Sequence, residues 1–286
     1  MKTLKPEQFS VLTSPYLHYT LEYALDSIAA NGFGGVELWG ASPHFCIDDY
    51  TPKERFARIQ SIRQMLKERG LKLTVFHPEQ CRQYPINIAS PIAYVRRCSM
   101  DVMCAYLEDT IALGADQMIL APGWEYVDAQ NEDNFKRAAE SIQILDEKAR
   151  TLGVRLLMEE MGATSTLFVR DLAHLERMIK AVGSDNISAC LDMVLAGGNQ
   201  ETIEDYYACF GSIGHVHFAD AGTEGYAALG LGSGAAEEQL QTLAEKGYDG
   251  GISISLWGAG FFKDPDKAMR QCSQWLRECK STAFGS

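Results

Sequence analysis

The stretch KGYDGGISISLWG, from Lys246 to Gly258, carries the pattern that decides the fold. It starts as the end of an amphipathic segment, passes through Gly247, and continues as an apolar run in which isoleucines alternate with Ser253 and Ser255. Glycine adopts the left-handed backbone that ends a helix at no steric cost, and side chains two apart on a strand share a face. The stretch therefore predicts a helix that ends at a glycine and leads into a strand with both serines on one face.

The same junction of helix, glycine and strand recurs along the chain, in NGFGGVEL, ERGLKLTV, LGADQMIL and LGVRLLM. Short apolar runs predict strands at residues 9–13, 34–39, 71–76, 116–121, 154–159, 187–192, 214–220 and 251–256. Amphipathic patterns predict helices at residues 21–30, 52–69, 91–113, 131–152, 171–182, 202–210, 237–246 and 266–279.

This alternation decides the fold class. Strands and helices that alternate regularly, with about 30 residues per unit, imply parallel strands joined by crossover helices. Eight such units close a barrel, and no linker-like or low-complexity segment divides the chain. We therefore predict an α/β protein that forms one (β/α)8 TIM barrel over residues 1–286, in preference to a doubly wound sheet.

Composition and charge narrow the class of protein. The chain has 286 residues, 46% of them hydrophobic and 22% charged, which is ordinary for a globular protein. A net charge of -12 argues against a phosphate-backbone partner. No signal-like segment or membrane-length apolar run is found, and the eight cysteines include no CxxC pair. We expect a cytoplasmic protein without a nucleic-acid or membrane partner.

A TIM barrel places its active site at the C-terminal ends of its strands and in the loops that follow. Polar and aromatic side chains gather at those ends, namely Glu37, Trp39, His44, His77, Glu79, Trp124, Glu125, Glu159, Glu160, Asp192, His215, His217, Asp220, Ser255 and Trp257. Their concentration on one rim predicts a site there.

Strand parity selects three of these residues. Glu160 points away from Glu159 or belongs to the next loop, and we interpret His215 as a hydrogen-bonded core residue, because it lies deeper than His217. Glu159, Asp192 and His217 could converge in the mouth of the barrel. Their oxygen and nitrogen donors suit Mn²⁺, Co²⁺, Zn²⁺ or Mg²⁺. Each alone could be a helix cap or a core residue, but their place at three successive strand ends favours a site.

The motifs also carry a family resemblance. In chain order, GFGGVELWG, the Glu that closes GVRLLME, the Asp that closes ACLD, GHVHFAD and KGYDGGISI resemble the xylose-isomerase-like TIM barrels, the sugar isomerase and epimerase superfamily that also contains endonuclease IV. The segments WGASPH, Pro78–Glu79 and YPIN resemble the fructoselysine 3-epimerase and ketose 3-epimerase branch. A DNA-repair role would need more than the six histidines present and a basic groove, so we set it aside.

The resemblance implies a chemistry and a ligand set. The implied cofactor is a divalent metal, usually Mn²⁺ or Co²⁺, bound by Glu159, Asp192, His217 and a second glutamate. The implied reaction moves a proton at a ketose carbon through an enediolate, with Glu159 as one of two catalytic glutamates on opposite faces of the sugar carbon. The implied partner is a small-molecule carbohydrate, and the resemblance leaves open a homo-oligomer.

The chain departs from the family pattern in three places. Ser255 stands where the second glutamate belongs, Leu195 replaces a substrate-binding histidine, and the loop at residues 222–234 lacks basic residues. Three hypotheses follow. In the first, the metal persists on three ligands and water, with Asp220, Glu125 or a partner chain at the missing ligand position. In the second, the reaction needs only one base, as in an isomerisation or elimination. In the third, the protein is a non-catalytic homologue that binds a sugar or supports a partner subunit.

The remaining rim residues are candidates for substrate binding: Glu37, Trp39, His44, His77, Glu79, Trp124, Asp220, Ser255 and Trp257. Each has a structural alternative. The tryptophans could stack on a sugar face or pack the rim, Glu37 could bind substrate or form a salt bridge with Arg155 or a neighbour, and His77 could contact substrate or support the metal ligands. The leading hypothesis is a metal-dependent ketose isomerase or epimerase.

Overall fold

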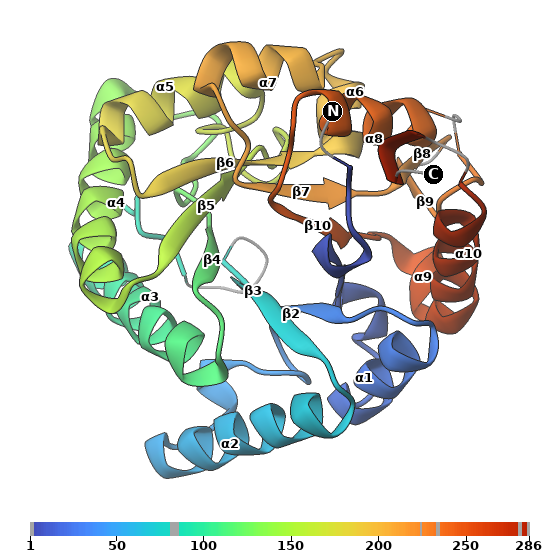
Figure 1. Ribbon diagram of the computed structural model, residues 1–286. Coiled ribbons are helices and arrows are strands. Elements are labelled where there is room, and N and C mark those ends of the chain that lie inside the picture. The colour runs from blue at the N-terminus through green and yellow to red at the C-terminus, as the bar shows by residue number, and fades with distance from the viewer. Residues whose placement is uncertain (1–2, 81–85, 224, 233–234, 280–281, 285–286) are drawn as a thin grey trace.

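Eight parallel strands close into a barrel in the computed structural model, which describes residues 3–80, 86–223, 225–232, 235–279 and 282–284 (Figure 1). The strands are β1 (Phe9–Leu12), β2 (Gly35–Gly40), β3 (Lys72–Pro78), β4 (Gln117–Leu120), β5 (Arg155–Glu159), β6 (Ile187–Asp192), β7 (His215–Phe218) and β10 (Gly251–Ile254). Their order around the barrel is β1-β10-β7-β6-β5-β4-β3-β2. The predicted TIM barrel is confirmed.

An outer ring of helices surrounds the strands (Figure 1). These are α1 (Leu21–Ala30), α2 (Pro52–Glu68), α3 (Ala93–Leu113), α4 (Glu132–Leu152), α5 (Leu172–Val182), α6 (Met193–Gly198), α7 (Ile203–Phe210), α8 (Ala236–Glu245), α9 (Ala259–Phe262) and α10 (Pro265–Glu278). Single 3-10 turns lie at Pro6–Gln8, Ser14–Tyr16, Ile47–Asp49 and Thr282–Phe284. Within the described residues, no helix has the length and apolar character needed to cross a membrane.

The predicted strands and helices lie within two residues of the observed ones. The glycine junctions explain this agreement: Gly153 ends α4 with φ 75°, and Gly247 follows α8 with φ 73°. The sequence did not predict α6, α9 or the antiparallel hairpin of β8 (Asp220–Gly222) and β9 (Gly225–Ala227). These elements have three to six residues each, which is too short for a periodic pattern to develop.

The interior of the barrel has an apolar and a polar side. An apolar cluster fills the side of β3 to β6 with Val75, Ile119, Leu157 and Cys190. On the opposite side the Oγ atoms of Ser10 and Ser253 are 2.7 Å apart, and Ser253 Oγ lies 2.9 Å from Nε2 of His215. The serine stripe of the last strand therefore belongs to a buried polar network, and the candidate site lies above it.

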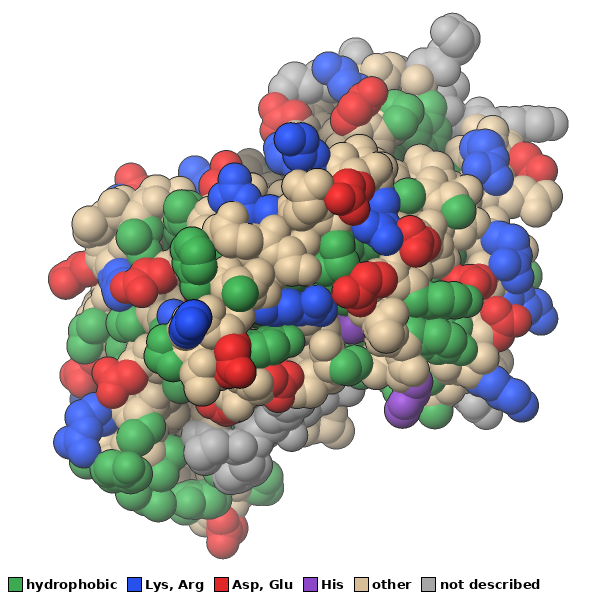
Figure 2. Space-filling view, turned by 90° about the horizontal axis from the view of Figure 1, so that it is seen from below, with side chains coloured by type: hydrophobic (Ala, Val, Ile, Leu, Met, Phe, Trp, Pro, Cys, Tyr) green, Lys and Arg blue, Asp and Glu red, His purple; other side chains and the backbone are tan. Residues whose placement is uncertain are grey.

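The face of the molecule drawn in Figure 2 carries side chains of both charges. On the face in Figure 2, Lys and Arg side chains are interspersed with Asp and Glu side chains. Neither sign forms a continuous field on that face, although the chain as a whole carries a net charge of -12. The surface shown in Figure 2 is therefore mixed in charge.

Gly35 marks a close approach of β2 to β1. A Cβ atom at Gly35 would lie 2.7 Å from Ser10 Cβ and 3.0 Å from Phe9 O, whereas a Cβ at Gly34 would have no neighbour within 4 Å. Because backbone atoms cannot move aside cheaply, we expect Gly35→Ala to lower the free energy of unfolding by about 1–3 kcal/mol. Gly34→Ala should change it by less than about 0.5 kcal/mol. Urea denaturation measures both, and equal midpoints for the two variants would contradict the tight packing.

Candidate active site at the carboxyl end of the barrel

A cavity of about 250 Å³ opens where the strands end. Side chains from β2, β3, β5 and the segment after β10 line it, together with Tyr226 of the β8–β9 hairpin. Five predicted site residues are among them: Trp39, His77, Glu79, Glu159 and Trp257. The rim selected from the sequence therefore encloses a real cavity.

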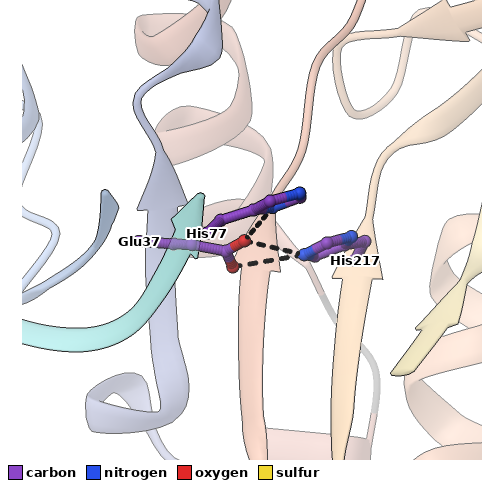
Figure 3. A group of neighbouring side chains, drawn as sticks. All are labelled: Glu37, His77 and His217. Atoms are coloured by element: carbon purple, nitrogen blue, oxygen red, sulfur yellow. Dashed lines mark hydrogen bonds and ion pairs between the residues drawn. The ribbon is translucent and has the colours of Figure 1, made fainter. Parts of the chain in front are cut away.

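Glu37 forms the floor of the site. Its side chain is fully buried on β2, one layer below the cavity. Nδ1 of His77 donates to Oε1 at 2.8 Å, and Nε2 of His217 donates to the same oxygen at 3.0 Å (Figure 3). Nε2 of His215 lies 3.1 Å from Oε2. One carboxylate thus holds three imidazole rings, and none of its partners is Arg155.

Charge is fixed within this network. Burial alone would raise the pKa of Glu37, but the positive charge of His217 and hydrogen bonds from the three histidines hold it well below its usual value. Burial alone would lower the pKa of His217, but Cys190, Glu159 and Glu37 raise it well above its usual value. Burial lowers the pKa of His215. The floor therefore carries a Glu37 carboxylate against a His217 imidazolium, with a neutral His215 beside it.

His217 also joins the floor to the cavity. Its second nitrogen, Nδ1, contacts Oε1 of Glu159, which lines the cavity. Two groups of potential metal ligands meet at His217: Glu37, His77 and His217, and Glu159, Cys190 and His217. Donor atoms within each group lie within 4.8 Å of one another. The sequence analysis did not select Cys190, although its place two residues before Asp192 puts it on the same face of β6.

Asp192 lies beside this group. It pairs in register with His217 on the neighbouring strand β7. Its Oδ1 accepts hydrogen bonds from the backbone N–H groups of Val194 at 2.8 Å and Leu195 at 3.0 Å, so it caps α6, and its Oδ2 accepts one from Tyr226 at 2.9 Å. Burial and the negative charge of Glu159 raise its pKa to about 6. Tyr226 was not predicted, because its hairpin has no strand-like pattern.

Ser255 is covered by an aromatic wall. Its side chain is fully buried, and Nε1 of Trp257 donates to its Oγ at 3.1 Å. The Trp257 ring meets the Trp39 ring edge-on, with centroids 5.1 Å apart, and lies 6.5 Å from the ring of His77. Among the described residues that line the cavity, Trp257 is present and Ser255 is not. The segment after β10 therefore gives the cavity an indole wall at this point.

Three other predicted binding residues lie outside the cavity lining. His44 is buried between Thr13 Oγ1 and Tyr16 O, each 3.1 Å from a ring nitrogen, and burial lowers its pKa to about 4. Asp220 accepts backbone N–H groups of the following loop. Trp124 is half-buried and its ring packs edge-on against Tyr126. None of these three residues is among the described side chains that line the cavity.

Arg155 and Glu125, which the sequence suggested as partners of the site, have other partners in the structure. The salt bridge between Glu37 and Arg155 is not formed, because Arg155 is exposed at the opposite end of β5 and donates to Ser188 Oγ at 3.1 Å. Glu125, considered as a replacement ligand, accepts a hydrogen bond from Asn134. The first two residues of the YPIN motif lie outside the described residues.

The donor set of the predicted site fits a divalent cation. Glu159 and Asp192 place like charges close together, which a cation would compensate. His217 has its Nε2 held by Glu37 and its Nδ1 turned to Glu159, and metal-binding histidines commonly donate their other nitrogen to a carboxylate in this way. The structure therefore offers candidate metal-binding groups in which Glu159 and His217 are shared with the sequence prediction.

Fold and site together define a TIM barrel with buried carboxylates and histidines, including candidate metal-binding groups, at the carboxyl ends of its strands. Residues 25–279 match the family described as xylose isomerase-like TIM barrel. The chain belongs to this family, and the resemblance found in the sequence motifs is confirmed.

Several known proteins are similar to the chain over most of its length. It is 20% identical over 249 residues to the fructoselysine 3-epimerase of Escherichia coli O157:H7, covering 86% of this chain and 89% of that protein. It is 26% identical over 263 residues to a putative hydroxypyruvate isomerase of Streptomyces coelicolor, covering 87% of each. A structure of D-psicose 3-epimerase from Clostridium cellulolyticum H10 with D-tagatose has the same fold, with a TM-score of 0.76 and 17% identity over 98% of each chain. The similarity to fructoselysine 3-epimerase agrees with the branch that the motifs indicated.

Proposed function

We propose that this protein is a metal-dependent isomerase or epimerase of a ketose or sugar conjugate, acting by proton transfer through an enediolate. One observation carries the proposal: Glu159 lines the cavity and contacts Nδ1 of His217, whose other nitrogen is held by the buried carboxylate of Glu37. This arrangement suits a carboxylate base beside a cation site.

Metal binding, proton abstraction and side-chain positioning are assigned to different residues of the site. Glu159, Asp192 and His217 would hold the divalent ion, His217 through Nδ1 after that nitrogen has lost its proton, and the ion would supply Lewis-acid polarisation of a sugar carbonyl. Glu159 takes a proton from the carbon next to that carbonyl, and the electron pair of the broken C–H bond moves into the carbonyl to give the enediolate. Glu37 fixes the orientation of His217 from below. Tyr226 keeps Asp192 in place by donating to Oδ2.

The cavity suits a small polar ligand. Its volume of about 250 Å³ falls just below the range of about 300–1,000 Å³ that is usual for ligand pockets. Trp39 and Trp257 give it an aromatic wall, and a sugar ring offers an apolar face to such a wall. The relatives named above act on ketoses, on fructoselysine or on hydroxypyruvate by name, so a monosaccharide ketose or its conjugate is the proposed substrate class.

Metal content tests the proposal. The protein purified without chelators is expected to hold stoichiometric Mn, Co or Zn by mass spectrometry of the metals, and Asp192→Ala should lose it. Asp185→Ala is the matched control, because Asp185 is exposed and pairs with Arg150 on the outer surface. Its metal content should equal that of the wild type.

The alternative hypothesis makes the opposite prediction. A non-catalytic homologue that binds a sugar or supports a partner subunit needs no metal. Wild-type protein that takes up neither Mn nor Co nor Zn, with Asp192→Ala indistinguishable from it, would favour this alternative over the enzyme.

A further inference from the structure

Four apolar side chains line the cavity on the same side of the barrel as Glu159. Ile119 and Ala121 lie at the end of β4, Met161 follows β5, and Leu195 lies on α6, which follows β6 directly. The strands β4, β5 and β6 are neighbours in the barrel. A hydroxyl group placed against such side chains loses its water without gaining a hydrogen bond. This side of the cavity therefore favours a ligand that presents a carbon without a hydroxyl group.

Leu195 lies beside the proposed ion site. Its backbone N–H donates to Oδ1 of Asp192 at 3.0 Å. Its side chain is half-buried, and a Cβ atom at Gly162 would lie 3.9 Å from Leu195 Cδ2, so the side chain is close to the segment that follows Met161. Among the described residues, the neighbouring Val194 packs against the apolar core of the barrel, whereas Leu195 does not. Apolar surface of Leu195 is therefore left for a ligand in the cavity.

The place of Leu195 selects one part of a ketose. A ketose can offer a single cation two oxygens on adjacent carbons, the carbonyl oxygen on C2 and the hydroxyl oxygen on C3. The carbons that flank this pair are C1 and C4, and C6 is farther along the chain. Because Leu195 is bonded to a carboxylate assigned to the ion, C1 or C4 is the part of the sugar within its reach.

We propose that Leu195 is a specificity-determining residue, which selects a ketose without a hydroxyl group on C1 or C4, beside the ion-bound oxygens. The substrate class is then a deoxyketose, for example a methyl ketone that lacks the hydroxyl on C1. This inference rests on the proposed function, because it names the substrate class of the same site.

The polar side chains near these apolar residues differ in what they can offer to a hydroxyl group. Oε1 of Gln80 accepts the backbone N–H of Ala121 at 2.9 Å, and its Nε2 donates to Ile119 O at 3.2 Å, so the amide is used by the backbone at the end of β4. Thr164 and Ser165 also line the cavity, and their hydroxyl groups are the competing partners for a sugar hydroxyl. Ser165→Ala is therefore the comparison variant in the test.

Binding of matched sugars tests the inference without requiring turnover. D-fructose, D-psicose and the 1-deoxy, 4-deoxy and 6-deoxy forms of each are titrated into the Mn²⁺-loaded protein. Tryptophan emission gives each Kd, because Trp39 and Trp257 line the cavity. We expect the 1-deoxy or the 4-deoxy form to bind about 10- to 100-fold more tightly than its parent, the discrimination typical of an apolar pocket, and the 6-deoxy form to stay within about 3-fold of it.

Three variants examine the side chain itself. Leu195→Asn has nearly the same size but offers an amide to a hydroxyl group, so the preference for the deoxy form should disappear. Leu195→Met keeps an apolar side chain and should keep the preference. Leu231→Asn is the matched control, because Leu231 is 64% exposed and is not among the residues that line the cavity. Its preference should equal that of the wild type.

Equal Kd values of wild type for each parent sugar and its 1-deoxy and 4-deoxy forms would overturn the inference and leave the proposed function standing. An equal gain for the 6-deoxy form would also overturn it, because the preference would then reflect general apolarity. Loss of the preference in Ser165→Ala instead of Leu195→Asn, or an equal loss of all the sugars in Leu195→Asn, would assign the selection elsewhere. Wild type that binds none of the sugars would overturn the proposed function, and this inference with it.

Discussion

Glu159→Gln is expected to lower kcat for ketose turnover by about 10²- to 10⁴-fold, the contribution usual for a catalytic acid or base. Glu159 is the carboxylate that both lines the cavity and contacts His217. Glutamine has nearly the same shape, but its amide cannot accept a proton from carbon and is a weaker metal ligand. Because Glu159 is assigned both roles, the loss should lie toward the upper end of this range. Steady-state kinetics on the reacting ketose measures it.

The matched control is the next residue, Glu160. Its side chain faces away from the cavity and accepts hydrogen bonds from Asn199 and Tyr206. Burial and the neighbouring Glu201 raise its pKa to about 8, so it is largely neutral at pH 7 and glutamine imitates it well. Glu160→Gln should therefore retain wild-type kcat. Equal losses in the two variants would show that position 159 acts through packing and not through its charge.

The largest expected effect on stability is that of Glu37→Gln. The Glu37 carboxylate is fully buried and accepts N–H groups from His77, His215 and His217. Glutamine replaces one acceptor oxygen by an N–H₂ donor, which would face imidazole N–H donors, and it leaves the buried His217 imidazolium without its counter-charge. Removing one partner of a buried ion pair typically costs about 3–5 kcal/mol.

Urea denaturation and metal titration measure this effect together. The free energy of unfolding should fall by about 3–5 kcal/mol, and metal affinity by about 10- to 100-fold, because His217 loses its orienting carboxylate. Glu108→Gln is the control: it removes a surface ion pair with Lys148, for which about 0–1 kcal/mol is expected. Unchanged stability and metal affinity in Glu37→Gln would contradict the role assigned to the floor.

The fold could be predicted almost completely from the sequence, because its information is local. Apolar periodicity and glycines such as Gly153 and Gly247 mark each junction within a few residues of chain. The short elements were not predicted, because three to six residues are too few for a periodic pattern. The helix α6 begins where Asp192 caps it, and the β8–β9 hairpin packs so that Tyr226 reaches Asp192.

The site was only partly predictable. Strand parity and strand ends are sequence properties, so Glu159, His77, Trp39 and Trp257 could be selected for the rim. The convergence of three histidines on Glu37 depends on how far each strand is shifted against its neighbours, and β2 and β3 shift register between Val36 and Glu37. No local pattern records such a shift. The sequence therefore identified the residues around the site more readily than their partners.

Loop residues were the least predictable. His44 follows a strand end directly, as a rim residue should, but its ring is held by Thr13 and Tyr16 and does not line the cavity. Asp220 is turned to the backbone of the following loop in the same manner. The direction of these side chains is set by contacts with residues 10 to 31 positions away in the chain, which neither spacing nor composition encodes.

Deuterium incorporation by the wild-type protein tests whether it moves a proton on the carbon beside a carbonyl with the help of a metal ion. D-psicose, D-fructose, D-tagatose, L-ribulose, fructoselysine and hydroxypyruvate are each incubated in D₂O with the enzyme, once loaded with Mn²⁺ or Co²⁺ and once stripped with a chelator, and examined by NMR. A metal-dependent isomerase or epimerase should place deuterium on the carbon beside the carbonyl of at least one of them, with formation of its isomer or epimer, in the metal-loaded sample only. The absence of deuterium incorporation from every compound with the metal-loaded protein would contradict it.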